Sequence, residues 1–465
     1  MIAPNISSDI DSTWQQDRQH VIHPYANYER FAKEGSVVYT QGRDHFIYDD
    51  QNQKYLDGIA GLWCVNIGHG NEEIADYIGE QAKNLAYYNT FEDATSPPTA
   101  HLAAKLASLC PGTLDHVFFG TGGSMANDSA IKMVHYYFNQ LGLPHKKKIL
   151  ARDLGYHGST YLAHALTGIR PTQVGFDLPI DLVTYLSAPY PYRRPQGMTI
   201  PEFCDLLIEE MENKILELGS ENIACFIAEP IMGAGGVIVP PEGYLVRTAE
   251  LCKRYDILFI ADEVVTAFGR LGKMIASQEL FGIQPDIIVL AKGLSSGYVP
   301  LGATVVSEAI HDVISRPKAE NPSFSHGFTY SGHALACATG LKNIEILERD
   351  NFCQHIETWG LYFKKQLKSL EDLPIVGEVR GSHYMLALEY VKDKNTKESF
   401  QPAIDIGKRM YYAAKERGLI IRPLGPLSVL SPPLTYDEEA IDETVAILKK
   451  SILQVMDDLQ KEGEI

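Results

Sequence analysis

Three short apolar runs, spaced about thirty residues apart, constrain the fold of this chain most strongly. The runs are Ile223–Ala228, Ile257–Ala261 and Ile287–Ala291, and a charged residue directly follows each one. Apolar runs of this length are typical of strands in a parallel sheet that is covered on both faces. The spacing leaves room for one helix between successive strands, so the sequence predicts an open α/β sheet.

The charged residues that follow the three runs are Glu229, Asp262 and Lys292. Ligands of open α/β sheets bind beyond the carboxyl ends of the strands, so we expect these residues to face one site. A desolvated lysine can form a Schiff base with a carbonyl, and an acid one strand away can hold a pyridinium nitrogen protonated, as in pyridoxal phosphate enzymes. A structural ion pair between Asp262 and Lys292 explains this stretch equally well.

Composition excludes several classes of protein. With 465 residues the chain is expected to form a large domain plus smaller units. A net charge of −18 argues against a nucleic-acid binder, because phosphates attract cationic proteins. The seven cysteines are scattered without a CxxC pair, which favours reduced thiols over a disulfide or metal framework. We see no secretory signal and no long apolar run, so we expect a cytoplasmic protein that is not in the membrane.

A glycine-rich loop, Gly120–Ser124, separates a short strand from a segment with helical spacing. This arrangement offers backbone N–H groups and the positive end of a helix to a phosphate. Alone the signal is weak, because such a loop is more often only a turn. Farther along, Tyr156 follows another expected strand and could stack on a planar ring.

The chain divides into three expected regions. Residues 1–65 contain an N-terminal arm and short antiparallel strands, which form part of a small domain. Residues 66–330 contain the large domain with the sheet. Residues 331–465 change to an α+β pattern, including a helix expected over 402–417, and form the rest of the small domain.

Several motifs occur together in a fixed order, and their combination is far more specific than any one of them. They are GGSMANDSAIK, GYHGST, AEPIMGAGG, ADEVVTAFGR, AKGLSSGYVPLGA, HGFTYSGHALACA and IRPLG. The ordered set resembles the class III aminotransferases, the ω-transaminase branch of fold-type I pyridoxal phosphate enzymes, over residues 20–460. The segments GLWCVNIGHG and YNTFEDATSPP are especially similar to the amine:pyruvate subgroup. The resemblance implies a homodimer or tetramer with its active site at the interface, and no metal.

The resemblance also implies a role for each site residue. Lys292 would bind the cofactor covalently and Asp262 would hold its pyridine nitrogen, so both are the expected catalytic residues. The remaining expected cofactor contacts are Gly123 and Ser124 at the phosphate, Tyr156 and Val264 on the two ring faces, His157 and Glu229 nearby, and Thr329 from the partner subunit. The expected substrate contacts are Arg422 for the keto acid's carboxylate, and Tyr25, Trp63 and Tyr156 around the amine, together with the partner subunit's Phe91.

The sequence departs from the family pattern in the glycine loop. The usual Ser-Gly-Ser-Glu is Gly122-Gly123-Ser124-Met125 here, so one hydroxyl and one acid are missing. Trp63 also has a simpler explanation, because a tryptophan in a glycine-rich segment is by default a core residue.

The expected function is transfer of an amino group from a primary amine or ω-amino acid, with diamines such as putrescine included, to a keto acid. The resemblance favours pyruvate as the acceptor and leaves 2-oxoglutarate open. The mechanism would be ping-pong. Two alternatives remain at this stage: an aminomutase or decarboxylase of the same fold, and a non-catalytic protein that binds a phosphate ligand.

Overall fold

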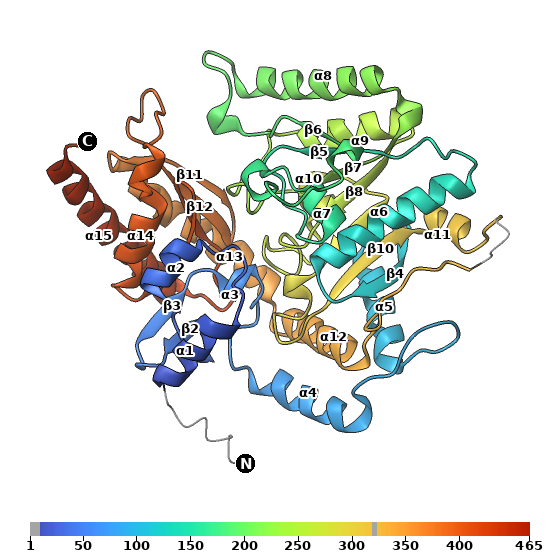
Figure 1. Cartoon of the computed structure of the whole chain (residues 1–465), viewed down its shortest axis with the longest axis horizontal. Coiled ribbons are helices and arrows are strands. Elements are labelled where there is room, and N and C mark those ends of the chain that lie inside the picture. Colours follow the sequence, from blue (N-terminus) through green and yellow to red (C-terminus); the bar gives the residue numbers. More distant parts are fainter. Residues whose placement is uncertain (1–9, 319–322) are drawn as a thin grey trace.

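The computed structural model describes residues 10–318 and 323–465. Its large domain is built on a seven-stranded sheet with the order β4-β10-β9-β8-β7-β5-β6 (Figure 1). The strands are β4 (Leu114–Gly120), β5 (Lys148–Arg152), β6 (Val183–Leu186), β7 (Ile223–Ala228), β8 (Leu258–Asp262), β9 (Ile287–Leu290) and β10 (Gly302–Ser307). Only β10 runs antiparallel to its neighbours, so the prediction of a mostly parallel sheet is confirmed.

The sheet is buried on both faces, as the continuous apolar runs predict. In β9, Ile288 and Leu290 point into one hydrophobic cluster, whereas Ile287 and Val289 point into a second cluster. This alternation follows from the two-residue period of a strand. Helices α5 (Pro97–Leu109), α8 (Ile200–Leu218), α9 (Tyr244–Arg254) and α12 (Ala334–Arg349) supply the first cluster, and α6 (Gly123–Gln140), α7 (Tyr161–Leu166) and α11 (Glu308–Ile314) supply the second.

Two smaller sheets complete the fold. One has the order β11-β12-β15-β14, and the other has the order β1-β2-β3-β13. Their strands are β1 (Tyr39–Arg43), β2 (Phe46–Asp49), β3 (Lys54–Asp57), β11 (Val376–Ser382), β12 (Met385–Tyr390), β13 (Leu419–Ile420), β14 (Arg422–Leu424) and β15 (Leu427–Leu430). Because β13 pairs with β3, Leu419 opposite Leu56, the two ends of the chain meet in one small domain. This part of the predicted fold is confirmed, whereas the exact boundaries at 65/66 and 330/331 stay a prediction.

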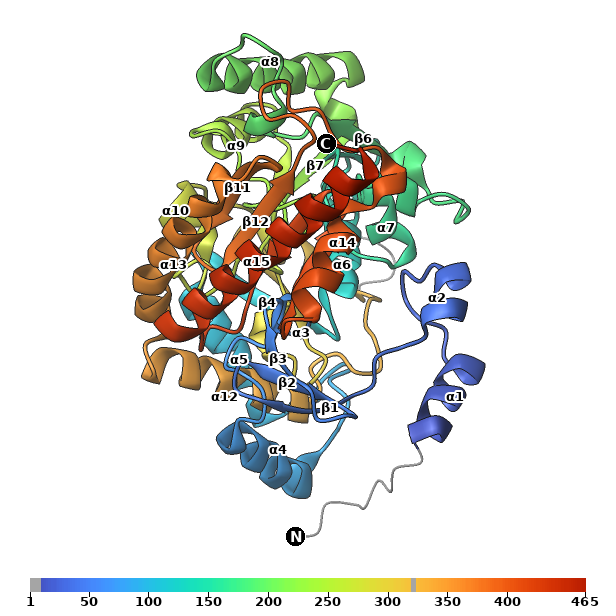
Figure 2. The same cartoon turned by 90° about the vertical axis from the view of Figure 1, so that its left-hand side faces the viewer.

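The remaining helices cover the small sheets or lie at the edge of the molecule. They are α1 (Ile10–His20), α2 (Tyr28–Glu34), α3 (Ala60–Trp63), α4 (Glu72–Leu85), α10 (Ala276–Phe281), α13 (Phe352–Lys368), α14 (Ile406–Lys415) and α15 (Glu438–Glu462). Figure 2 shows α1 and α2 on the outside of the molecule, apart from the large sheet, as expected of an arm. Within residues 10–318 and 323–465, no helix is long and apolar enough to cross a membrane.

Candidate active site

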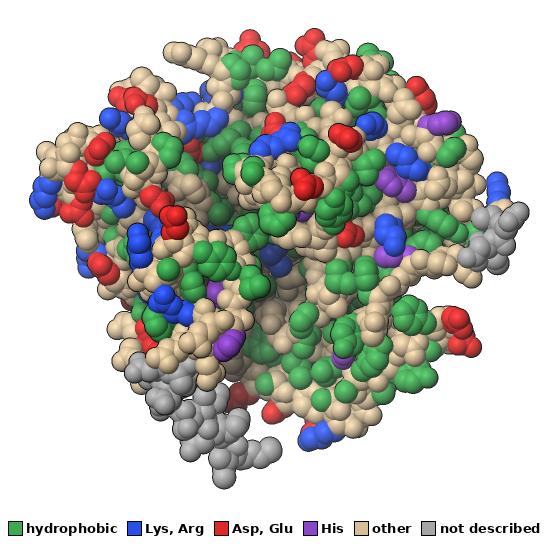
Figure 3. Space-filling model, in the orientation of Figure 1, with side chains coloured by type: hydrophobic (Ala, Val, Ile, Leu, Met, Phe, Trp, Pro, Cys, Tyr) green, Lys and Arg blue, Asp and Glu red, His purple; other side chains and the backbone are tan. Residues whose placement is uncertain are grey.

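The expected site lies where strands of the large sheet end, and the face of the molecule in Figure 3 is hollowed between the small and large domains. Lys292 follows β9 and has a φ of 48°, a strained value for a residue with a side chain. Burial lowers the pKa of its amine, although the negative charge of Asp262 acts in the opposite direction. Among the described residues, none forms a hydrogen bond or ion pair with this amine. The alternative of a structural ion pair with Asp262 is therefore wrong, whereas the role of Lys292 as a nucleophile stays a prediction.

Asp262 ends β8 and is held by three donors. Its Oδ2 accepts hydrogen bonds from His157 Nδ1 and Asn127 Nδ2, both at 2.8 Å, and its Oδ1 accepts one from the Val264 N–H at 3.1 Å. Burial disfavours the charged form, but the hydrogen bond and positive charge of His157, followed by Asn127, outweigh it and lower the pKa of Asp262. The carboxylate therefore stays ionised, as it must in order to hold a protonated ring nitrogen.

Asn127 is a site residue that sequence reasoning missed. Its amide group donates to Asp262 Oδ2 and also to the His157 carbonyl at 2.7 Å, so it connects two predicted residues. The signal was present: Asn127 lies three and four positions after Ser124 and Gly123, which places all three on one face of α6. No role could follow from that spacing alone, because the partners come from other elements.

Glu229 supports the loop that carries Tyr156. Its carboxylate accepts the N–H of Tyr156 at 2.9 Å and the N–H of Gly233 at 2.7 Å, and burial raises its pKa. The Tyr156 hydroxyl lies 3.2 Å from Ser159 Oγ and 3.5 Å from the Tyr25 hydroxyl. Burial raises the pKa of Tyr156 to about 12, so the phenol is neutral at physiological pH. The structure thus brings four predicted residues together, Glu229, Tyr156, Tyr25 and His157.

The start of α6 has the features of a phosphate cradle. Its N-terminus at Gly122 has no side-chain cap, which leaves backbone N–H groups for a ligand. A Cβ added at Gly123 would lie 3.0 Å from a methyl group of Val264, so glycine permits this close approach. Ser124 Oγ accepts the Ser159 N–H at 3.1 Å. The uncapped helix end therefore fits the phosphate of pyridoxal phosphate.

Met125, which replaces the family's usual acid, has a local partner. Its sulfur accepts a hydrogen bond from the Thr121 hydroxyl at 2.7 Å. Met125 therefore has a hydrogen-bond partner in the loop, whereas the effect of the missing hydroxyl at Gly122 stays a prediction.

Arg422 begins β14 and is the only predicted carboxylate ligand. Its Nε is buried and finds no hydrogen-bond partner among the described residues. Burial lowers the pKa of the guanidinium, and its charge in turn lowers the pKa of Lys292. A half-buried guanidinium close to the lysine, with no carboxylate partner in the described part of the chain, is suited to an anionic substrate group.

The remaining predicted residues are the substrate contact Trp63, and the substrate contact Phe91 and cofactor contact Thr329 that are expected from a partner subunit. Trp63 is 5% exposed and packs in a cluster with Ile231 and Leu427, so its role as a pocket wall stays a prediction. Phe91 is half exposed and its ring lies against Gly327, and the carbonyl of exposed Thr329 accepts the Tyr87 hydroxyl.

Phe91 and Thr329 thus lie on the surface of the chain. No hydrogen bond among the described residues links either one to Lys292, Asp262 or Arg422. Their contribution to the site of a second subunit also stays a prediction.

Comparison with known proteins agrees with this geometry. The profile of the family described as aminotransferase class-III matches residues 28–452. The chain is 40% identical to the putrescine–pyruvate aminotransferase of Pseudomonas aeruginosa, over 95% of this chain and 96% of that protein. It is also 40% identical to the diaminobutyrate–2-oxoglutarate transaminase of Halomonas elongata, over 97% of both.

A solved structure shares the whole fold. The (S)-enantioselective ω-transaminase of Thermomicrobium roseum superposes with a TM-score of 0.93 at 42% identity, covering 96% of this chain and 99% of that one. The expected transaminase class and its cofactor are confirmed by this match and by the family profile. The chain therefore belongs to the class III aminotransferases, which use pyridoxal phosphate to transfer amino groups.

Proposed function

We propose that this transaminase takes the amino group of a primary amine or ω-amino acid, diamines such as putrescine included, and passes it to a keto acid, with pyruvate as the preferred acceptor. The observation that carries the proposal is Arg422, a half-buried guanidinium without a protein carboxylate beside the lysine. Such a group recognises the carboxylate that every keto acid carries. The putrescine–pyruvate relative supports both substrates.

The residues of the chain divide the chemistry between them. Pyridoxal phosphate, when bound, supplies an electron-withdrawing ring that stabilises negative charge on the substrate carbon. Lys292 Nζ, with its lowered pKa, accepts the proton from that carbon. Asp262 keeps the ring nitrogen protonated, and His157 and Asn127 fix its carboxylate for this task.

The binding residues orient both reactants. The uncapped start of α6 at Gly123 and Ser124 would hold the phosphate, and Tyr156 and Val264 would enclose the ring. Tyr25 and Trp63 would border the amine. In a homodimer, the minimum assembly that we propose, Phe91 and Thr329 of the partner subunit would complete the pocket; their exposure in a single chain supports this arrangement.

A cytoplasmic location is also part of the proposal. All seven cysteines are free thiols in the structure, which suits a reducing compartment.

The first experiment is a half-reaction followed by visible absorbance. The purified protein is mixed with putrescine, 4-aminobutyrate, taurine or 1-phenylethylamine in turn, and then with pyruvate or 2-oxoglutarate. The cofactor band is expected to bleach with putrescine and to return with pyruvate. A band that none of these four amines bleaches would refute the amine class, and return only with 2-oxoglutarate would refute the acceptor.

A further inference from the structure

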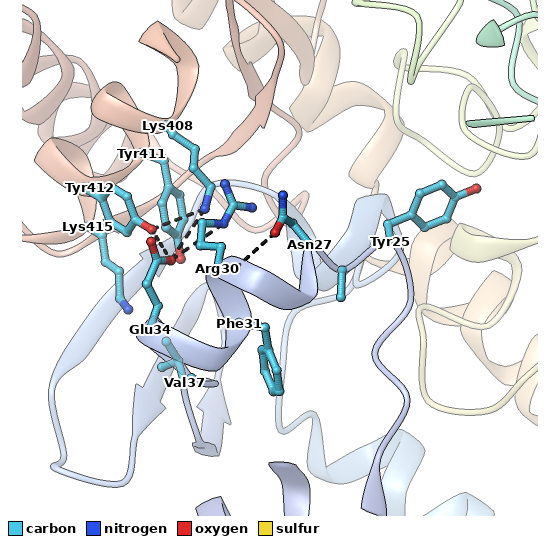
Figure 4. Close-up of a pocket in the computed structure, with 12 residues that line it drawn as sticks. Tyr25, Asn27, Arg30, Phe31, Glu34, Val37, Lys408, Tyr411, Tyr412 and Lys415 are labelled. Atoms are coloured by element: carbon cyan, nitrogen blue, oxygen red, sulfur yellow. Dashed lines mark hydrogen bonds and ion pairs between the residues drawn. The ribbon is translucent and has the colours of Figure 1, made fainter. Parts of the chain in front are cut away.

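A second cavity lies outside the active site, between the N-terminal arm and α14. It encloses about 460 Å³ and is lined by arm residues from 25 to 37 and by residues of α14 (Figure 4). Tyr25 borders this cavity and also reaches the active site, where its hydroxyl lies 2.8 Å from Ser159 Oγ. The two sites therefore share one residue, whose ring points away from the cavity in Figure 4.

Three cations and one carboxylate line the cavity: Arg30, Lys408 and Lys415 against Glu34. Two more carboxylates lie outside the lining, since Asp405 is 3.8 Å from Arg30 and Asp49 acts on Lys415 by its charge. Glu34 accepts the Tyr412 hydroxyl at 2.6 Å, whereas Lys408 and Arg30 approach the same carboxylate only to 3.7 and 3.8 Å. Figure 4 shows both cations directed at this one acid. Neither cation makes a close hydrogen bond with it, so both retain donors for a ligand.

Lys415 has no direct contact partner in the described part of the chain, and the charge of Asp49 acts on it only from a distance. Among the described residues, none makes a hydrogen bond or ion pair with its amine, although the residue is partly buried. Burial lowers the pKa of Lys415 despite the charge of Asp49. Burial and the charge of Arg30 lower the pKa of Lys408 despite the charges of Glu34 and Asp405. Partly buried cations without a close hydrogen-bond partner gain free energy when an anion enters the cavity and accepts their hydrogen bonds.

We propose that this cavity binds a small polyanion with at least two carboxylate or phosphate groups, and that binding fixes the arm against α14. The anion would draw Arg30 from the arm and Lys408 and Lys415 from α14 onto one molecule. The arm segment that carries Tyr25 would then lose freedom at the edge of the active site. Because coupling between sites is reciprocal, an amine held beside Tyr25 would in turn strengthen binding of the polyanion.

The direct test is a calorimetric titration of the cofactor-saturated protein with inorganic pyrophosphate, and separately with citrate. One molecule is expected to bind per chain. Lys415→Gln and Arg30→Gln are each expected to weaken binding by roughly tenfold or more, the effect of losing one hydrogen bond between charged groups. Lys449→Gln, which removes an exposed lysine of α15, is the matched control and should bind as the wild type does.

The outcomes separate this cavity from the active site. Binding that survives both variants, or that is lost in Arg422→Gln instead, would overturn the proposal, as would the absence of any heat. Pyrophosphate binding without citrate binding would identify phosphate as the preferred group and still support the site.

A second measurement follows the arm itself. Hydrogen exchange of the peptide that covers residues 21–36 should slow on adding pyrophosphate to the wild type and remain unchanged in Lys415→Gln. Equal exchange with and without pyrophosphate in the wild type would refute the ordering of the arm. Neither measurement depends on which amine or keto acid the enzyme uses.

Discussion

Replacing Asp262 with asparagine tests the electrostatic logic of the site with a single atom. The native carboxylate receives two donors on Oδ2, from His157 and Asn127, and one donor on Oδ1, from Val264. The asparagine oxygen is therefore expected to take the Oδ2 position. Its NH₂ group then replaces Oδ1, faces the Val264 N–H, and presents a donor where the cofactor's ring nitrogen needs an acceptor.

The expected loss follows from this reversal. The ring nitrogen would be left unprotonated, because a donor stabilises its neutral form, and the ring would no longer accept the substrate carbon's electrons well. Losing one preorganised electrostatic contact costs about 10²- to 10³-fold in rate, or about 3–4 kcal/mol. We expect the rate constant of the amine half-reaction to fall by this factor while the cofactor remains bound.

The assay is stopped-flow absorbance of the amine half-reaction under single-turnover conditions. Asp312→Asn, a change of the same kind at an exposed position, is the control and should leave the rate unchanged. A half-reaction in Asp262→Asn that stays within twofold of the wild type, with cofactor bound, would refute the reasoning.

Three further predictions concern single side chains. Lys292→Ala should abolish turnover in a product assay, and normal turnover would remove the central assignment. Arg422→Gln should raise the KM for the keto acid by roughly ten- to a hundredfold, because it removes a hydrogen bond between charged groups. It should leave the rate of the putrescine half-reaction nearly unchanged. An unchanged KM for the keto acid would contradict the assignment. Burial, followed by the charge of Lys132, lowers the pKa of His326 from 6.5 to about 4. Between these two pH values the unfolded chain binds more protons than the folded chain. The stability of the protein should therefore fall as the pH drops from 6.5 to about 4. His326→Gln should flatten that fall in a series of thermal melts, and an identical fall would show that other groups cause it.

The sheet could be predicted because strands that are buried on both faces consist of apolar residues without interruption. Strands β7 and β9 are covered on both faces, so Ile223–Ala228 and Ile287–Leu290 are continuous apolar runs. Helix boundaries were less certain: a helix was expected over 402–417, but α14 covers only Ile406–Lys415, with a short 3₁₀ turn before it.

The candidate site was predictable only in part. Residues that end neighbouring strands, such as Asp262 and Lys292, could be placed together from topology alone. Asn127 could not, because its hydrogen bonds depend on how α6, the loop after β5 and the end of β8 approach one another. The choice between an ion pair and a free amine at Lys292 depends on side-chain directions, which no sequence pattern records.

The pairing of β13 with β3 has a consequence for how the protein is made. Strand β3 leaves the ribosome early, but its partner, Leu419–Ile420, is synthesised more than three hundred and fifty residues later. The small domain therefore closes late, since contacts this distant in sequence form slowly. Arg422 lies two residues beyond β13 and reaches its place in the same closing step. A nascent chain that stops before β13 would hold the predicted cofactor residues of the large domain without Arg422, the proposed ligand of the acceptor's carboxylate.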